Sequence, residues 1–442
     1  MQLALPSFSG TKEVRAESLF RSAALRWTWC VYTQGLTRAG RWFLWPTLIF
    51  TSYGSTSLEL QAYILFAYAF GLWAAALACM FLWRPRVRFQ AHHADRVCAG
   101  ETLPVAVEVV QQGGPAAARL HVLPHDLPRE VDAAPEDGVA LPPLAPGEGA
   151  QARLGLSCQH RGVYRLKGYR VETSFPFGLL RARRTFAEER PLVVYPKFSR
   201  LARLRIPTGR RLQPGGVALA SAVGDSFEFV GDREYREGDN VRDIDWRATA
   251  RLNRPIVREY REEYFLRVAV VLDTHVPRAA SGLKAVGGAA QRARQQQLET
   301  FERAVSLCAA VSDYMARQDY LVDIFAAGPN LYHLTAGRSL AYLDQILDIL
   351  ACVEDSPDEG FGMLEPELME NLAQITSVVC VLLDWDAARR DFVYRLKEHG
   401  AGTKVIVVRD TPCTLDLAAD ADQLGGIPVL SKAACDAGIE EL

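Results

Sequence analysis

The sequence of 442 residues lacks most of the short motifs that identify an enzyme or a metal site. It has no G-x-x-x-x-G-K-[ST] phosphate loop, no H-E-x-x-H and no G-x-S-x-G. Its nine cysteines form no C-x-x-C pair, and their number is odd. Scattered cysteines of this kind are typical of reduced, buried thiols in a cytosolic setting rather than of a disulfide framework. These absences predict a protein that is not an enzyme, with no catalytic and no cofactor-binding residues.

The sequence also lacks an excess of either charge. The formal net charge is −2, so it provides no basic stripe for a polynucleotide, and we expect no nucleic-acid partner. Hydrophobic residues make up 49% and charged residues 23%, which are ordinary values for globular proteins. A chain of this length predicts two or three domains with cores of their own.

Residues 1–41 lack the short apolar core and the small-residue cleavage site of a signal peptide. We expect this segment to stay attached, as a cytoplasmic or interfacial N-terminal region. Trp27 and Trp29 stand near Arg26, and indole rings beside arginines suit the headgroup layer of a membrane. An ordinary amphipathic helix would give a similar pattern.

Residues 62–83 contain no charged side chain. A helix over this range is about 33 Å long at about 1.5 Å per residue, so it predicts a transmembrane helix. Residues 42–58 are also uncharged, although Pro46 and several hydroxyl side chains interrupt them. Arginines flank only the outer ends of this pair, which favours a hairpin over residues 42–83 with both ends in the cytoplasm. The alternative is a single span, with residues 42–58 in the interface.

In residues 84–198 the apolar residues recur with a period of two instead of in long apolar runs. Val105, Val107 and Val109 alternate with other residues, and turn-forming residues recur between such segments. We expect an all-β sandwich. Residues 199–265 begin with a segment rich in Arg, Pro and Gly and form a connection. In residues 266–442, apolar strands alternate with helical patterns such as residues 298–315, so the fold class is doubly wound α/β for this last domain.

One run, residues 224–263, alternates acidic and basic side chains and includes two aromatic residues. Arg forks and carboxylates at this spacing form bidentate pairs that hold a turn in one shape. The spaced residues of the run are Arg233, Tyr235, Gly238, Asp239, Arg242, Ile244, Asp245, Trp246, Thr249, Ala250 and Arg251, with Arg236 among them. One interpretation is an internal ion-pair network that joins two domains. The other is a docking surface for a partner protein.

These residues match the pattern R-x-Y-x-x-G-D-x-x-R-x-I-D-W-x-x-[ST]-A-R, and in this respect the chain resembles the bacterial DUF58 family. The resemblance implies a membrane hairpin, an all-β region and a von Willebrand A-like domain in residues 266–442. It also implies a MoxR-type AAA+ ATPase as partner, and no settled biochemical activity. Residues 160–180 are similar to the family's strand pair that ends in a D-P-F-G-L turn, but Phe175 stands in place of the Asp.

A von Willebrand A domain holds a divalent cation with an Asp at the end of a strand, a D-x-S-x-S run and a Thr. Asp273 and Asp384 each follow an apolar strand, and parallel sheets bind ligands at that edge. His275 and Pro277 stand in the two serine positions, and neither has a hydroxyl group. We therefore expect no metal and no cofactor, with Mg²⁺ at Asp273 and Asp384 as the open alternative and loop capping as their simpler role.

The sequence thus predicts a multidomain, multi-pass protein of the bacterial inner membrane with its soluble domains in the cytoplasm. Its partners are the lipid bilayer and a protein, which the resemblance identifies as a MoxR-type AAA+ ATPase. The predicted docking surface combines the exposed part of residues 224–263 with the rim around Asp273 and Asp384. Two alternatives stay open at this point: a metal-dependent ligand receptor and an enzyme that acts on envelope precursors.

Overall fold

The computed structural model divides the chain into two compact units, 1–197 and 198–442, which are described separately. The residues that the structure describes are 31–56, 60–114, 116–207, 227–236, 239, 241–262, 267–277, 288–328, 330–335, 340–358 and 360–442. Gly238 and the predicted interfacial tryptophans Trp27 and Trp29 lie outside them.

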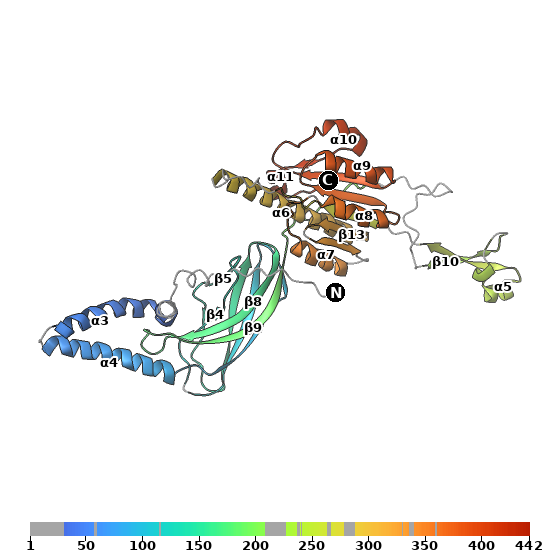
Figure 1. Cartoon of the computed structure of the whole chain (residues 1–442). Coiled ribbons are helices and arrows are strands. Elements are labelled where there is room, and N and C mark those ends of the chain that lie inside the picture. Colours follow the sequence, from blue (N-terminus) through green and yellow to red (C-terminus); the bar gives the residue numbers. More distant parts are fainter. Residues whose placement is uncertain are drawn as a thin grey trace. The chain divides into compact units, whose positions relative to one another are not determined.

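The first unit begins with two long helices that form a hairpin (Figure 1). After a turn of π-helix at Val31–Gly35, α3 covers Arg38–Thr56 and α4 covers Leu60–Leu82. The indole of Trp73 in α4 donates to Thr47 Oγ1 in α3 over 3.3 Å, and its ring lies 6.1 Å from that of Phe43. The two helices therefore pack on each other.

Among the described residues, one helical segment, 63–82 in α4, is long and apolar enough to cross a membrane. Most of its large apolar side chains are exposed, which is the arrangement that a lipid-facing helix needs. Helix α3 fails the same test because it carries Arg38, Arg41 and a series of hydroxyl groups. The prediction that residues 42–58 form a second span, and that the protein is multi-pass, is therefore not supported.

Pro46 does not end α3, contrary to the interruption that the sequence indicates. A proline within a helix removes one backbone donor and exposes nearby carbonyl groups. Here the hydroxyl of Thr47 donates to Phe43 O over 2.7 Å, and that of Thr51 donates to Thr47 O over 2.7 Å. Hydroxyl groups that bond to the preceding turn satisfy backbone carbonyls in place of water.

Two β-sheets pack around one core in the rest of the first unit, as predicted for residues 84–198 (Figure 1). The four-stranded sheet has the order β1 (Val87–His92), β3 (Thr102–Gln111), β7 (Gly149–Cys158), β5 (Val131–Ala134). The five-stranded sheet has the order β2 (Arg96–Cys98), β9 (Ala182–Tyr195), β8 (Gly162–Thr173), β4 (Leu120–Pro124), β6 (Val139–Ala140). The alternation at Val105, Val107 and Val109 is confirmed, because all three side chains are buried in the shared core.

The second unit is built on a six-stranded sheet with helices on both faces. Its order is β14 (Leu331–Thr335), β13 (Leu321–Ala327), β12 (Arg267–Leu272), β15 (Ser377–Leu382), β16 (Gly402–Val408), β17 (Val429–Leu430). All neighbours are parallel except β14, which is antiparallel to β13. The winding direction reverses between β12 and β15, so the doubly wound prediction is confirmed.

The helices of this unit are α6 (Gly288–Arg317), α7 (Leu340–Cys352), α8 (Phe361–Asn371), α9 (Ala387–Glu398), α10 (Ala418–Leu424) and α11 (Lys432–Ala437). The apolar stripe predicted for residues 298–315 is the buried side of α6, where Phe301, Val305 and Met315 are at most 2% exposed. Residues 198–207 belong to this unit as well. They run beside the last residues of the chain, where Ala202 donates to Glu440 O over 2.9 Å.

Candidate functional site

The acidic and basic run folds as a hairpin of its own. Strands β10 (Phe227–Glu234) and β11 (Ile256–Glu262) pair antiparallel, and a turn of 3-10 helix, η2 (Val241–Asp243), and helix α5 (Trp246–Leu252) connect them. We call the described residues from 227 to 262 the signature hairpin (Figure 1). A two-stranded ribbon is only marginally stable by itself, so side-chain contacts must hold its connection in shape.

A bidentate ion pair fixes the turn that leaves β10. Arg233 Nη1 donates to Asp239 Oδ2 over 2.7 Å, and Nη2 donates to Oδ1 over 2.9 Å. The backbone N–H of Arg236 donates to the same carboxylate over 2.7 Å. A fork that holds both carboxylate oxygens restricts direction as well as distance. The pair therefore determines where the turn places its other side chains.

Asp245 fixes the start of α5 and joins it to β11. As the N-cap residue it accepts hydrogen bonds from the backbone N–H groups of Arg247 (2.9 Å) and Ala248 (3.0 Å). Its second oxygen accepts two bonds from Arg258 on β11, at 3.0 and 2.8 Å. Thr249 Oγ1 accepts the N–H of Ile256 over 3.0 Å, so the helix is fixed to the strand at two points.

Several apolar and cationic side chains of this segment are exposed, and together we call them the exposed face. Trp246 is 67% exposed although it is the first residue of a capped helix, and Val241 and Leu252 are exposed too. The members of this face are Tyr235, Arg236, Val241, Arg242, Trp246, Arg247, Arg251 and Leu252. An exposed Trp with a Tyr and several arginines has the composition of a protein-binding hot spot.

The pH dependence of the hairpin follows from Asp239. The side-chain bond from Arg233, and then the backbone N–H of Arg236, lower the pKa of Asp239 from 3.8 to about 2. A carboxyl group whose pKa is lower in the folded state than in the unfolded state stabilises the fold fully at pH values above its unfolded-state pKa. This stabilisation is lost as the pH falls toward its folded-state pKa. We expect hydrogen-exchange protection of β10 and β11, corrected for intrinsic rates, to hold down to about pH 4 and to fall between about pH 4 and 2.

Asp239→Asn is the matched variant for this titration. It lacks the charge at every pH, so its protection is expected to be lower at neutral pH and to change less in the acid range. Equal acid profiles for the two proteins would contradict the assignment.

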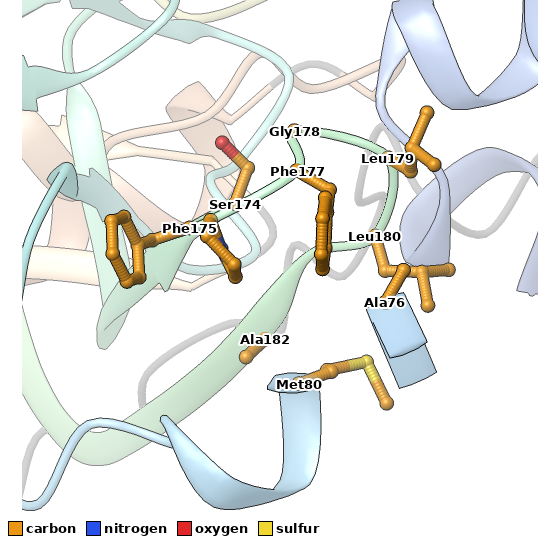
Figure 2. Close-up of a pocket in the computed structure, with 10 residues that line it drawn as sticks. Ala76, Met80, Ser174, Phe175, Phe177, Gly178, Leu179, Leu180 and Ala182 are labelled. Carbon is orange, nitrogen blue, oxygen red and sulfur yellow. The ribbon is translucent and has the colours of Figure 1, made fainter. Parts of the chain in front are cut away.

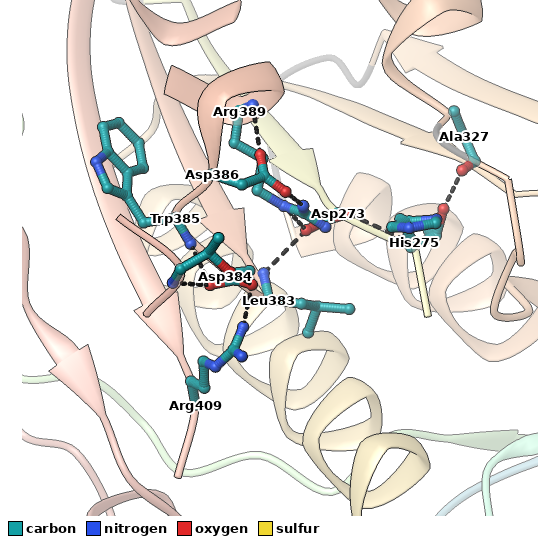
Figure 3. A network of polar contacts seen from close by, with 11 residues as sticks. Asp273, His275, Ala327, Leu383, Asp384, Trp385, Asp386, Arg389 and Arg409 are labelled. Atoms are coloured by element: carbon teal, nitrogen blue, oxygen red, sulfur yellow. Dashed lines mark hydrogen bonds and ion pairs between the residues drawn. The ribbon is translucent and has the colours of Figure 1, made fainter. Parts of the chain in front are cut away.

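A second cluster lies at the edge of the large sheet where the winding reverses (Figure 3). Asp273, directly after β12, is 2% exposed. One of its oxygens accepts the N–H of His275 over 3.0 Å. The other accepts the N–H of Leu383 (2.9 Å) and the Nε–H of Arg389 (2.7 Å).

Arg389 is as buried as the carboxylate it binds, because its side chain is 4% exposed. Its second fork nitrogen donates to Asp386, the N-cap residue of α9, and its guanidinium lies 5.7 Å from the centre of the Phe361 ring. Burial alone would lower the pKa of Arg389, but Asp273 and Asp386 outweigh that effect and raise it. A permanent cation therefore lies at the switch point of the sheet.

Asp384, after β15, closes a loop of the same edge. Its carboxylate accepts the backbone N–H groups of Trp385 (2.8 Å) and Thr414 (3.0 Å), the Thr414 hydroxyl (2.6 Å) and an ion pair from Arg409. Burial raises the pKa of this carboxyl group, but the bonds from Thr414 and the others outweigh it, and the pKa is lowered. Asp384 thus caps the loop that follows β16.

Comparison with known proteins gives a family for part of this region. The model of the family described as protein of unknown function DUF58 matches residues 231–410, which is less than half of the chain. This match supports the DUF58 family. It includes the signature hairpin from residue 231 and both acids of the sheet edge.

Other comparisons add no argument beyond the DUF58 match. A search of curated proteins found no match. A crystal structure of the CARDB domain of the PF1109 protein from Pyrococcus furiosus, in complex with di-metal ions, is similar to the chain at 14% identity. It covers 25% of this chain and 94% of that domain, with a TM-score of 0.17, which is too low to carry an inference.

The sheet edge at Asp273 does not fit a divalent cation. Both carboxylate oxygens are used by backbone N–H groups and by Arg389, whose positive charge would repel a metal ion. Within the described ranges, no group of three or more His, Cys, Asp or Glu side chains is placed to hold a metal. Hard cations need several oxygen ligands without a competing cation, and Asp273 already accepts three hydrogen bonds, one of them from Arg389.

Sequence reasoning identified Asp239, Asp245, Asp273 and Asp384 but missed other residues of the two clusters and of the exposed face. The missed residues are Val241, Leu252, Arg258, Asp386, Arg389 and Arg409. Arg389 lies 116 positions from Asp273, and no spacing in the sequence relates the two. For Asp386 a signal was present, because an Asp directly before a helical pattern is a common N-cap.

Proposed function

We propose that this protein is a membrane-anchored, cytoplasm-facing binding protein that presents the exposed face of its signature hairpin to a MoxR-type AAA+ ATPase. The observation that carries the proposal is the exposure of Trp246 on a helix whose start is fixed by the Asp245 cap and by the ion pair of Asp245 with Arg258. These contacts hold Trp246 in solvent. An exposed Trp adds little to the stability of the fold, and its ring is available to a binding partner. The MoxR-type partner is implied by the resemblance to DUF58 proteins.

The anchor is α4, with α3 packed beside it as the second arm of a hairpin. Its exposed apolar surface supports a position in the bacterial inner membrane. Arg84 and Arg86, directly after α4, support a cytoplasmic position for the C-terminal end of this helix, by the positive-inside rule. Confinement beside a membrane raises the effective concentration of partners that bind there.

A von Willebrand A-like identity for residues 266–442 is part of the same proposal. The doubly wound order, the antiparallel edge strand β14 and the acid that ends β12 support it. In such a domain the strand-end edge carries the ligand site. Here Arg389 supplies the positive charge of that site, so the domain would act as a structural platform for protein contacts.

The alternatives receive less support from the geometry. A metal-dependent receptor needs free ligands at Asp273, which Arg389 and two backbone groups occupy. An enzyme acting on envelope precursors needs a carboxyl group whose pKa is raised toward neutrality. Among the residues that the structure describes, the carboxyl groups with a shifted pKa all have it lowered and are all paired: Asp239, Asp245, Glu299 and Asp384.

Co-purification from detergent-solubilised membranes tests the proposal. We expect the intact protein to retain a MoxR-type ATPase, and Trp246→Ala to reduce the retained amount at least about tenfold, because truncation of a hot-spot Trp costs about 2 kcal/mol or more. Tyr342→Ala, at another exposed aromatic residue, is the matched control. Equal ATPase recovery with all three proteins would remove the hairpin from the docking surface.

A further inference from the structure

The turn between β8 and β9, residues 174–181, is an apolar loop that packs against the presumed membrane helix rather than on the sandwich core. It carries the sequence Ser-Phe-Pro-Phe-Gly-Leu-Leu before Arg181. A small hollow lies between this loop and α4, lined by Ala76 and Met80 from the helix (Figure 2). The ring of Phe175 meets that of Trp83 edge to face, with centroids 6.2 Å apart.

The loop is also fixed to the start of α3. The backbone N–H of Thr37 donates to Leu179 O over 3.0 Å, and that of Arg181 donates to Gly35 O over 2.9 Å. Gly40 is needed at this contact, because a Cβ there would overlap the carbonyl oxygen of Leu179. Backbone hydrogen bonds on one side and ring contacts on the other hold the loop at a fixed level along the hairpin.

That level lies inside the apolar length of α4. Ala76 is six residues before Leu82, where α4 ends, and six residues correspond to about 9 Å along a helix. Interfacial segments bury their apolar faces about 5–10 Å into the boundary between headgroups and acyl chains. Phe177, at the tip of the loop, is 45% exposed and therefore has apolar surface available at this depth.

Arginines lie next to the apolar residues of α3, of α4 and of the loop, at the ends that meet at this level. Arg84 and Arg86 follow α4, Arg181 and Arg183 follow the loop, and Arg38 begins α3. Guanidinium groups at the end of an apolar segment suit the phosphate level of a membrane with anionic lipids. Three separate segments thus indicate one boundary between headgroups and acyl chains.

We propose that residues 175–180 insert into the cytoplasmic leaflet, where Phe177 contacts the acyl chains beneath anionic phospholipid headgroups. The loop is then a second membrane contact beside α4, and it sets the level of the β-sandwich at the bilayer surface. This inference rests on the proposed anchoring by α4.

Photo-crosslinking in nanodiscs of phosphatidylethanolamine and phosphatidylglycerol tests it. The full chain carries p-benzoylphenylalanine in place of Phe177, of Phe70 in α4 or of Tyr342 in the second unit, and adducts are identified by mass spectrometry. All three native residues are exposed aromatic side chains, so the replacement is conservative. We expect phospholipid adducts at positions 177 and 70, and at least tenfold fewer at position 342.

The outcomes separate this inference from the proposed function. Lipid adducts at position 70 with none at position 177 would overturn the loop insertion and leave the anchor in place. An absence of lipid adducts at both positions would overturn the anchor as well. A crosslink from position 177 to a second copy of the chain would replace the bilayer by a protein interface, and equal labelling at position 342 would also count against insertion.

Discussion

Replacing Arg389 by Met is expected to lower the free energy of unfolding of the second unit by about 3–5 kcal/mol, because the variant leaves a buried carboxylate without its cation. Asp273 is 2% exposed, and Arg389 is its only charged partner among the residues that the structure describes. The two remaining backbone N–H donors cannot neutralise the charge.

Thermal unfolding of the full chain in detergent measures this loss. For a domain of this size, 1 kcal/mol corresponds to about 2–4 °C, so the melting temperature should fall by about 6 °C or more. Arg390→Met is the matched control, since the side chain of this neighbouring arginine is 41% exposed and its replacement should change stability by no more than about 0.5 kcal/mol. Equal shifts for Arg389→Met and Arg390→Met would contradict the description of the edge.

A double variant distinguishes the cost of leaving one buried charge unpaired from the contribution of the ion pair itself. Replacing Asp273 by Leu and Arg389 by Met removes both charges, and apolar pairs of similar volume are often as stable as a buried ion pair. We expect the double variant to be more stable than Arg389→Met alone. If the double variant lost as much unfolding free energy as Asp273→Leu and Arg389→Met lose together, the two charges would act independently.

Trp385→Ala is expected to cost about 3–5 kcal/mol, the usual cost of truncating a buried aromatic residue. Trp385 is fully buried between the sheet and α9, and its indole N–H donates to Asp420 over 3.0 Å. Trp246→Ala should change stability by no more than about 0.5 kcal/mol, because that ring is exposed. The melting temperatures of Trp385→Ala and Trp246→Ala measure both effects. Similar losses of stability in the two variants would contradict the assignment of Trp246 to a docking surface.

Local patterns in the sequence predicted the elements that depend on local physics. The alternation at Val105, Val107 and Val109 predicted a strand of the sandwich, and the three- and four-residue spacing from Phe301 to Met315 predicted the buried side of α6. Both patterns arise because a regular element buries one face, so periodicity is enough to detect them.

Contacts between distant residues could not be predicted in this way. Thr37 and Leu179 are 142 positions apart, and Asp273 and Arg389 are 116 apart. The exposure of Trp246 was equally hidden, because a helix of seven residues is too short for periodicity to indicate which side is buried. The sequence shows that the serines expected after Asp273 are absent. It does not show that Arg389 compensates the charge of this acid.

The central claim is that the signature hairpin contacts a protein partner at the cytoplasmic side of the membrane. Photo-crosslinking from position 246 in living cells, with Tyr342 as the control position, tests it most directly. The account predicts a membrane-bound adduct between this chain and a MoxR-type ATPase from position 246 and at least tenfold less from position 342. Lipid or solvent products alone from position 246, or equal protein adducts from both positions, would contradict it.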